Sequence, residues 1–378
     1  MISFDSEIIC LFELIKASLF DSHSPISDEA NWERVIDLVK AQCIMPLVIS
    51  HVPSEYKKEC IELSNKSKAH YMQLLFEQDN LVKLFKANDI PLVIIKGTAA
   101  AIYFPSTSLR TFGDIDFFIS DEHIENALLL LKENGYRFLS SDSRQYEFEK
   151  NGIEFELHSK FSCRHYNDID HIILNGMNNI VDYKIGNYSF CGLPTYENGL
   201  VLLGHIMQHL KSSGIGLRQI LDWMMFVHEE LDDSAWYDHF QPLANEAGLE
   251  KLATTVTFMC KKWLGLPNDI SWCKAADEDV ADQLMLRIVD DGNFGHYRAP
   301  CEKVKKSFNE EGTFKYLQKS GMINWPLAQK CAFFRPFAWL YQLCRYGGKG
   351  ISSLFTGKKV FIKSTQYLSL EELWKELE

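Results

Sequence analysis

The chain has 378 residues, of which 46% are hydrophobic and 24% charged, and its formal net charge is −12. These values are typical of soluble globular proteins, so they exclude a disordered chain, a collagen-like repeat and a small disulfide-stapled domain. The acidic balance also excludes nucleic-acid binding by bulk electrostatics, so any phosphate contact must come from a local basic patch. Residues 303–363 are such a patch, because they hold twelve Lys and Arg residues against Glu310 and Glu311.

Cellular location is indicated by features that are missing from the sequence. The ten cysteines are scattered without a CxxC motif, which favours reduced thiols in the cytoplasm. Acidic residues interrupt the N-terminal apolar stretch, which argues against a secretory signal. The segment 325–346 is apolar but contains charged residues and prolines, so we expect no transmembrane span and a cytoplasmic protein.

Hydrophobic periodicity divides the chain into four regions. Most of the chain outside the centre has apolar residues at helical spacing, as from Ile8 to Leu19, whereas the centre has short β-branched runs. The predicted regions are an N-terminal helical region (1–88), an α/β core (89–190), a helical domain (191–300) and a basic, aromatic C-terminal region (301–378). The helices predicted in the first and third regions cover 28–42, 54–86, 197–210, 217–230, 243–264 and 278–290.

The α/β core begins with two predicted strands. Residues 91–96 form a β-branched run typical of a buried strand, and Gly97-Thr98 follows it before a helical turn at 99–103. A second strand is predicted at 114–119, and a helix at 122–134. A glycine between a strand and a helix lets backbone N–H groups approach an anion, so the turn at Gly97 is a candidate phosphate site.

A β-hairpin is the clearest local prediction. Residues 146–150 and 153–158 alternate strictly between apolar and polar side chains around Asn151-Gly152, which is typical of a two-residue type I′ turn. That turn places Phe148 opposite Phe155 and Glu147 opposite Glu156. We interpret the carboxylates of Glu147, Glu149 and Glu154 as a solvated face.

Asp114 and Asp116 are the first candidates for chemistry. Residues two apart on a strand point to the same face, where two carboxylates repel unless a cation neutralises them. Glu156 on a neighbouring strand could supply a third carboxylate. We expect the three to converge on one face of one sheet and to raise one another's pKa values. Because we expect this strand to face solvent, we predict that Asp116→Asn leaves the fold intact or slightly stabilised.

These residues together resemble a known family. Lys96-Gly97-Thr98, Arg110, Gly113-Asp114-Ile115-Asp116 and Glu156-Leu157-His158 are similar to the motifs of nucleotidyltransferases of the DNA polymerase beta type. The closest resemblance is to the bacterial "uncharacterised nucleotidyltransferase" family. Residues further along the chain also resemble the helical half of that family; they are His205, His209, Arg218, Asp222 and Gly292 to Gly295.

The resemblance implies an α+β fold, with a small mixed sheet flanked by N- and C-terminal helical regions, and a metal-dependent enzyme. It would move a nucleoside monophosphate from an NTP to an acceptor hydroxyl, and Asp114, Asp116 and Glu156 would be catalytic and would hold Mg²⁺ or Mn²⁺. The residues implied to bind the nucleotide are Lys96, Gly97, Thr98, Arg110 and Gly113. The substrate-facing positions are His158, His209, Arg218 and Asp222.

Several alternatives stay open at this stage. The acceptor could be a small molecule, a glycan intermediate, a protein or a tRNA, and the protein could be an RNA-modifying toxin or a catalytically silent nucleotide-binding module. His205 and His209 have the spacing of zinc ligands but lack a third one, and Arg218 and Asp222 could form a simple helix ion pair. The patch at 303–363 could contact tRNA or a membrane surface, or it could be a packed helix.

Overall fold

The computed structural model describes most of the chain up to Asn293 and short pieces beyond it. The described residues are 4–20, 30–142, 144–161, 169–210, 214–293, 317–318, 321–322, 325, 328, 332–341, 343 and 377. None of the helices within these ranges is both long and apolar enough to cross a membrane. The prediction for 303–363 falls mainly outside the described residues.

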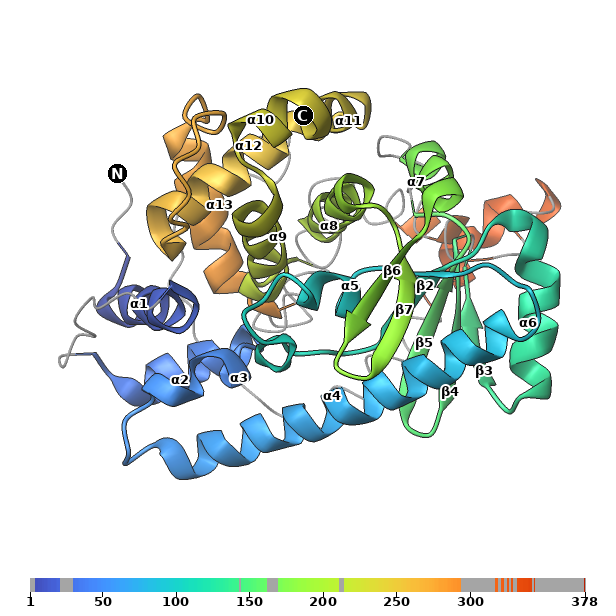
Figure 1. The fold of residues 1–378 in the computed structure, drawn as a ribbon, viewed down its shortest axis with the longest axis horizontal. Coiled ribbons are helices and arrows are strands. Elements are labelled where there is room, and N and C mark those ends of the chain that lie inside the picture. The colour runs from blue at the N-terminus through green and yellow to red at the C-terminus, as the bar shows by residue number, and fades with distance from the viewer. Residues whose placement is uncertain are drawn as a thin grey trace.

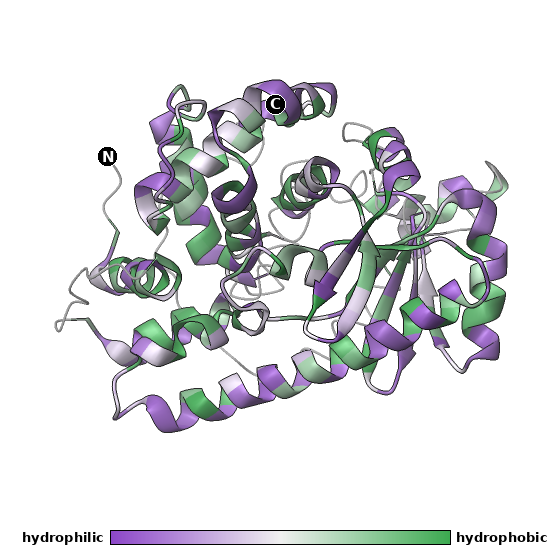
Figure 2. Cartoon of the chain, in the orientation of Figure 1, coloured by the Kyte–Doolittle hydropathy of each residue, from purple (hydrophilic) through white to green (hydrophobic). Residues whose placement is uncertain are grey.

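Helices make up the N-terminal region, as the sequence predicts. They are α1 (Ser6–Phe20), α2 (Trp32–Ala41), α3 (Met45–Val48) and α4 (Lys57–Lys86). Figure 1 shows α4 running from these helices to the sheet, along which it lies. Figure 2 shows hydrophobic and hydrophilic residues alternating along α4, and its buried residues, such as Leu74, Leu81 and Phe85, pack on the sheet.

A seven-stranded mixed sheet forms the centre, with the order β3-β4-β5-β2-β1-β7-β6. Its strands are β1 (Val93–Ile94), β2 (Ile115–Phe118), β3 (Arg137–Ser141), β4 (Gln145–Lys150), β5 (Ile153–His158), β6 (Val181–Ile185) and β7 (Tyr188–Gly192). The helices α5 (Gly97–Ala101), α6 (Ile124–Glu133) and α7 (Asp170–Gly176) connect them. The expected fold class is therefore confirmed.

Helices also follow the sheet in the chain. They are α8 (Thr195–Leu210), α9 (Leu217–Glu230), α10 (Asp233–Ala235), α11 (Gln241–Glu246), α12 (Glu250–Met259) and α13 (Glu278–Asp291). The prediction of a single helix over 243–264 is wrong. The helix is interrupted between α11 and α12 at Gly248, whose φ is +64°. A left-handed backbone at glycine is a common way to end a helix.

Two hydrophobic cores cover the two faces of the sheet. Side chains of α4 and α6 pack on Ile115, Phe117 and Phe155 on one face. On the other face, Val93 and Phe118 join a larger core that is shared by the N-terminal helices and α8 to α13. Because side chains alternate along a strand, Asp116 and Glu156 must point toward this second, helix-covered face.

Candidate functional site

Asp116 and Glu156 lie side by side on neighbouring strands. The strands β2 and β5 are parallel, and Asp116 is the register partner of Glu156. The hairpin fixes the register of β5 against β4, its other neighbour: Asn151 and Gly152 both have positive φ, and Glu147 faces Glu156 as predicted. A type I′ turn requires positive φ at both central residues, which asparagine and glycine tolerate.

His158 joins these two carboxylates. Its Nε2 atom lies 2.8 Å from Oδ1 of Asp116 and 3.5 Å from Oε2 of Glu156. One potential ligand atom from each of the three residues lies within 4.8 Å of the others, the spacing of a metal-binding group. Of the three carboxylates predicted to converge, Asp116 and Glu156 lie side by side, whereas Asp114 precedes β2 and is not part of this group. His158 approaches the pair more closely than the sequence suggests.

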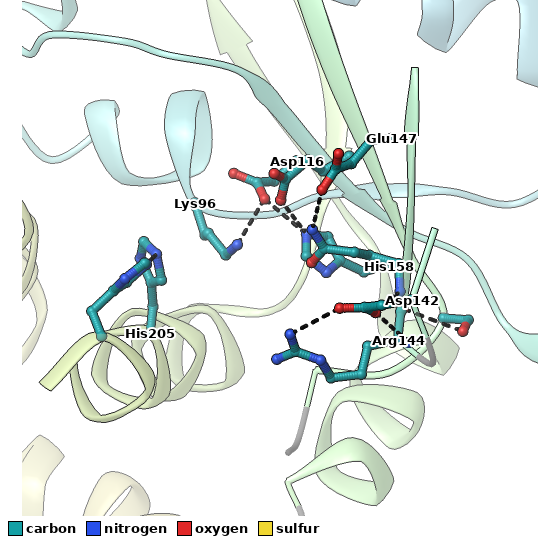
Figure 3. Close-up of polar contacts among 11 residues, drawn as sticks. Lys96, Asp116, Asp142, Arg144, Glu147, His158 and His205 are labelled. Carbon is teal, nitrogen blue, oxygen red and sulfur yellow. Dashed lines mark hydrogen bonds and ion pairs between the residues drawn. The ribbon is translucent and has the colours of Figure 1, made fainter. Parts of the chain in front are cut away.

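Lys96 is the main counter-charge of this cluster. Its Nζ donates to Oδ1 of Asp116 at 2.7 Å, and both side chains are buried. Figure 3 shows Lys96 and His158 approaching Asp116 from different sides. Lys96 has φ +55°, an uncommon value for a residue with a side chain. Such backbone conformations persist where the surrounding structure imposes them, often at functional sites.

The carboxylates of Asp114 and Asp116 have opposite electrostatic environments. Burial, together with Asp116 and Glu156, raises the pKa of Asp114 to about 7. Burial alone would also raise the pKa of Asp116, but Lys96 and His158 outweigh it and hold that pKa far below its usual range. The expectation that like charges raise each pKa is therefore confirmed for Asp114 and wrong for Asp116, because the sequence did not reveal its two cationic partners.

A loop before Asp114 is held by helices on two sides. Arg110 donates through Nε and Nη2 to the two carboxylate oxygens of Asp222 on α9, at 2.7 and 2.8 Å. Arg218, one turn earlier on α9, donates to the Thr111 carbonyl at 3.4 Å. From α4, His70 contacts the Gly113 carbonyl at 3.0 Å. Arg110 and Asp222, which the sequence assigned separately to nucleotide and substrate, are therefore bound to each other.

The glycine turn lies next to the same loop. A β-carbon built on Gly97 would lie 3.8 Å from the Asp114 carbonyl oxygen, and φ of Gly97 is +27°. The predicted helical turn is present as α5, which has five residues. Thr98 is buried, and its hydroxyl donates to Gln78 of α4 at 2.7 Å. A phosphate contact by Gly97 or Thr98 stays a prediction.

His205 and His209 form a pair on α8. Their Nε2 atoms are 2.6 Å apart, a hydrogen bond in which one ring donates and the other accepts. Figure 3 shows His205 across from Lys96. Burial, the neighbouring His209 and Lys96 lower the pKa of His205 well below its usual range, and burial with Lys96 and Arg218 lowers that of His209 to about 3. Both imidazoles are therefore neutral at pH 7.

This pair predicts a pH dependence of stability. An unfolded histidine titrates near 6.5, whereas folded His209 titrates near 3, so the unfolded chain binds the extra proton as the pH falls between these values. We therefore expect wild type to lose about 2 kcal/mol more than His209→Gln between pH 8 and pH 5. Urea unfolding at several pH values measures the difference. If the difference in free energy of unfolding between wild type and His209→Gln stays constant with pH, the prediction is wrong.

Arg144 is a further charged residue that the sequence did not single out. It precedes Gln145 in β4, and its Nη2 contacts Oδ2 of Asp142 at 3.2 Å. It also contributes to the lowered pKa of His209. Its carbonyl accepts from the Ser159 amide at 2.8 Å, just after His158. An arginine next to an alternating hairpin gives no sequence signal, because its place near His158 and His209 depends on strand pairing.

Comparison with known proteins bears on the family of the chain. The profile of a family described as "uncharacterised nucleotidyltransferase" matches residues 28–265. No curated protein matches the chain.

The solved structures that are similar to parts of the chain include two with low sequence identity. One is ANT(2″)-Ia in complex with adenylyl-2″-tobramycin, with 11% identity and a TM-score of 0.35 over 46% of this chain and 95% of that chain. The other is an antigenic nucleotidyltransferase-like protein from Paracoccidioides brasiliensis, with 15% identity and a TM-score of 0.33 over 54% of this chain and 93% of that one.

Proposed function

The chain belongs to the uncharacterised nucleotidyltransferase family. We propose that it uses a divalent cation to move a nucleoside monophosphate from an NTP to an acceptor hydroxyl. The observation that carries the proposal is the register pair of Asp116 and Glu156, with Asp114 two residues earlier on the chain. Three carboxylates near one buried face are costly without cations, which a metal-dependent transferase would bind.

The donor atoms fit Mg²⁺ or Mn²⁺. Both ions prefer carboxylate oxygens, which Asp116 and Glu156 would supply together with the imidazole of His158. Asp114, whose pKa burial and these two carboxylates raise, would add a third carboxylate. A bound cation would neutralise phosphate charge and favour ionisation of the attacking hydroxyl. With its pKa near 7, Asp114 would lose a proton on binding the cation.

The remaining groups of the site would orient the substrates. In the transfer, the acceptor oxygen forms a bond to the α-phosphorus as its proton leaves, and the bond to the departing pyrophosphate breaks. Lys96 and Arg218 carry positive charge near the carboxylates and would contact the triphosphate. The neutral pair of His205 and His209 lies near Lys96 and would line the acceptor side of the site without adding charge.

Incubation with each α-labelled NTP, Mg²⁺ or Mn²⁺, and lysate fractions tests the function. We expect one fraction to become labelled with wild type and not with Glu156→Gln, because the amide removes a charged ligand. Glu154→Gln is the matched control: Glu154 lies on the same strand but is exposed and faces Glu149. This control should label as wild type does.

Two outcomes would contradict the proposal. Labelling that survives Glu156→Gln would exclude Glu156 from the metal site. Stabilisation by NTP and metal in a thermal melt, without labelling in any fraction, would favour the silent nucleotide-binding module instead.

A further inference from the structure

The ammonium group of Lys96 is buried among the carboxylates proposed to bind metal. It is bonded to Asp116 and shielded from solvent, with its Nζ 5.7 Å from the centre of the Phe161 ring. Burial alone would lower the pKa of Lys96, but Asp116, Glu156 and Asp114 outweigh burial and raise it. Lys96 therefore stays charged, and all three carboxylates interact with this one cation.

The backbone fixes the contact between Lys96 and Asp116. The amide of Ile95 donates to the carbonyl of Asp116 at 3.0 Å, so the residue before Lys96 is tied to the strand that carries Asp116. The carbonyl of Lys96 accepts from Ala100 at 2.8 Å in α5. Because the backbone on both sides of the Lys96 α-carbon is held, the side chain starts next to the strand that carries Asp116.

Lys96 shares the cluster with the cationic groups of His158 and Arg218, whereas the histidine pair on α8 adds no positive charge. His205 and His209 are neutral, partly because of Lys96 itself. His158 contacts the same Oδ1 atom of Asp116 that Lys96 contacts. A divalent cation bound to that oxygen would place two further positive charges next to the ammonium, and like charges repel strongly at a buried site.

We propose, on the basis of the function proposed above, that Lys96 is a resident counter-cation of the carboxylate cluster, which a divalent cation must displace from Asp116. In the metal-free protein the lysine balances the acidic charge. Its four-carbon stem is flexible enough to release the carboxylate. A triphosphate offers the displaced ammonium a new partner, so nucleotide and metal should strengthen each other's binding by the same factor.

Binding of Mn²⁺ to Lys96→Met tests this proposal without turnover. The variant keeps an apolar stem and removes the charge. Without nucleotide, we expect Lys96→Met to bind Mn²⁺ at least about tenfold more tightly than wild type, because no ammonium has to leave. A non-hydrolysable NTP analogue should then improve Mn²⁺ affinity in wild type more than in the variant. Lys96→Arg retains the charge and should bind Mn²⁺ as weakly as wild type.

Thermal melting gives a second, independent measurement. In EDTA, Lys96→Met should have a lower Tm than wild type, because Asp116 loses its buried partner. Mn²⁺ should then raise the Tm of this variant more than that of wild type. The matched control is Lys262→Met, since Nζ of Lys262 contacts the buried carboxylate of Asp282 at 2.6 Å, among the later helices. Lys262→Met should also have a lower Tm than wild type in EDTA, but Mn²⁺ should raise its Tm no more than that of wild type.

Equal or weaker Mn²⁺ binding by Lys96→Met would overturn the role of Lys96 and leave the transferase proposal standing. Failure of wild type and the variant alike to bind Mn²⁺ would overturn both proposals. If Lys96→Met does not fold, Lys96→Gln replaces it, because glutamine keeps hydrogen-bond donors without the charge. Mn²⁺ binding by Lys96→Gln that is no tighter than by wild type would then overturn the role of Lys96.

Discussion

Asp116→Asn is expected to abolish nucleotidyl transfer and to destabilise the protein. Asp116 is buried and accepts from Lys96 and His158. An amide in its place leaves a buried ammonium without its carboxylate, and breaking a buried ion pair on one side typically costs about 3–5 kcal/mol. Relief of the repulsion between Asp116 and Asp114 offsets part of this cost, so we expect a loss near the lower end of that range.

This expectation reverses the stability prediction made from the sequence. That prediction assumed a solvent-facing strand, and it is wrong because all four residues of β2 are buried. Urea denaturation and the labelling assay measure the two effects separately. Asp121→Asn is the control, because Asp121 is exposed shortly after β2. A variant Asp116→Asn that is more stable than wild type would show that repulsion among the carboxylates outweighs the pairing with Lys96.

The hairpin was predictable to within one residue because its signals are local. The Asn-Gly turn fixes the connection, and strict alternation fixes which side chains face the core, so Phe148 pairs with Phe155 as expected. The helices α8, α9 and α13 also lie within a few residues of their predicted bounds. Long apolar stripes define such helices independently of their neighbours.

Other strands lacked a local signal. All five residues of β3 are exposed, and β6 is mostly exposed, so neither shows the apolar pattern on which a strand prediction depends. The strand β1 is only Val93–Ile94 within a predicted run of six residues. These strands exist because neighbouring strands satisfy their backbone hydrogen bonds, which is a property of the folded sheet.

In the candidate site, too, local patterns identified some residues, whereas contacts that depend on the tertiary fold were not predictable. Asp114, Asp116 and Glu156 were identifiable as candidates because their spacing on two predicted strands favours one shared face, and the structure pairs Asp116 with Glu156. The partner of Asp116 was not identifiable, because contact with Lys96 depends on how β1 pairs with β2. Arg110 and Asp222 are separated by 112 positions, and only the packing of α9 against the loop before β2 brings them together.

Arg110→Met is expected to lower the free energy of unfolding by about 3–5 kcal/mol, because it leaves the buried carboxylate of Asp222 without its partner. The double variant Arg110→Met with Asp222→Leu removes both charges and should recover most of that stability. It should not recover transfer, because the ion pair holds the loop that leads to Asp114. Urea denaturation and the labelling assay of both variants measure these outcomes.

An exposed ion pair provides the control for this prediction. Arg137 donates through Nε and Nη2 to one oxygen of Glu149 at the edge of the sheet, where 68% of the arginine side chain is accessible. Arg137→Met should cost less than about 1 kcal/mol, because solvent screens the pair. If Arg110→Met lowers the free energy of unfolding no more than Arg137→Met does, the ion pair of Arg110 with Asp222 does not stabilise the fold. If the double variant regains transfer together with stability, the loop before Asp114 is positioned by other contacts, of which Arg218 to Thr111 and His70 to Gly113 are the first to test.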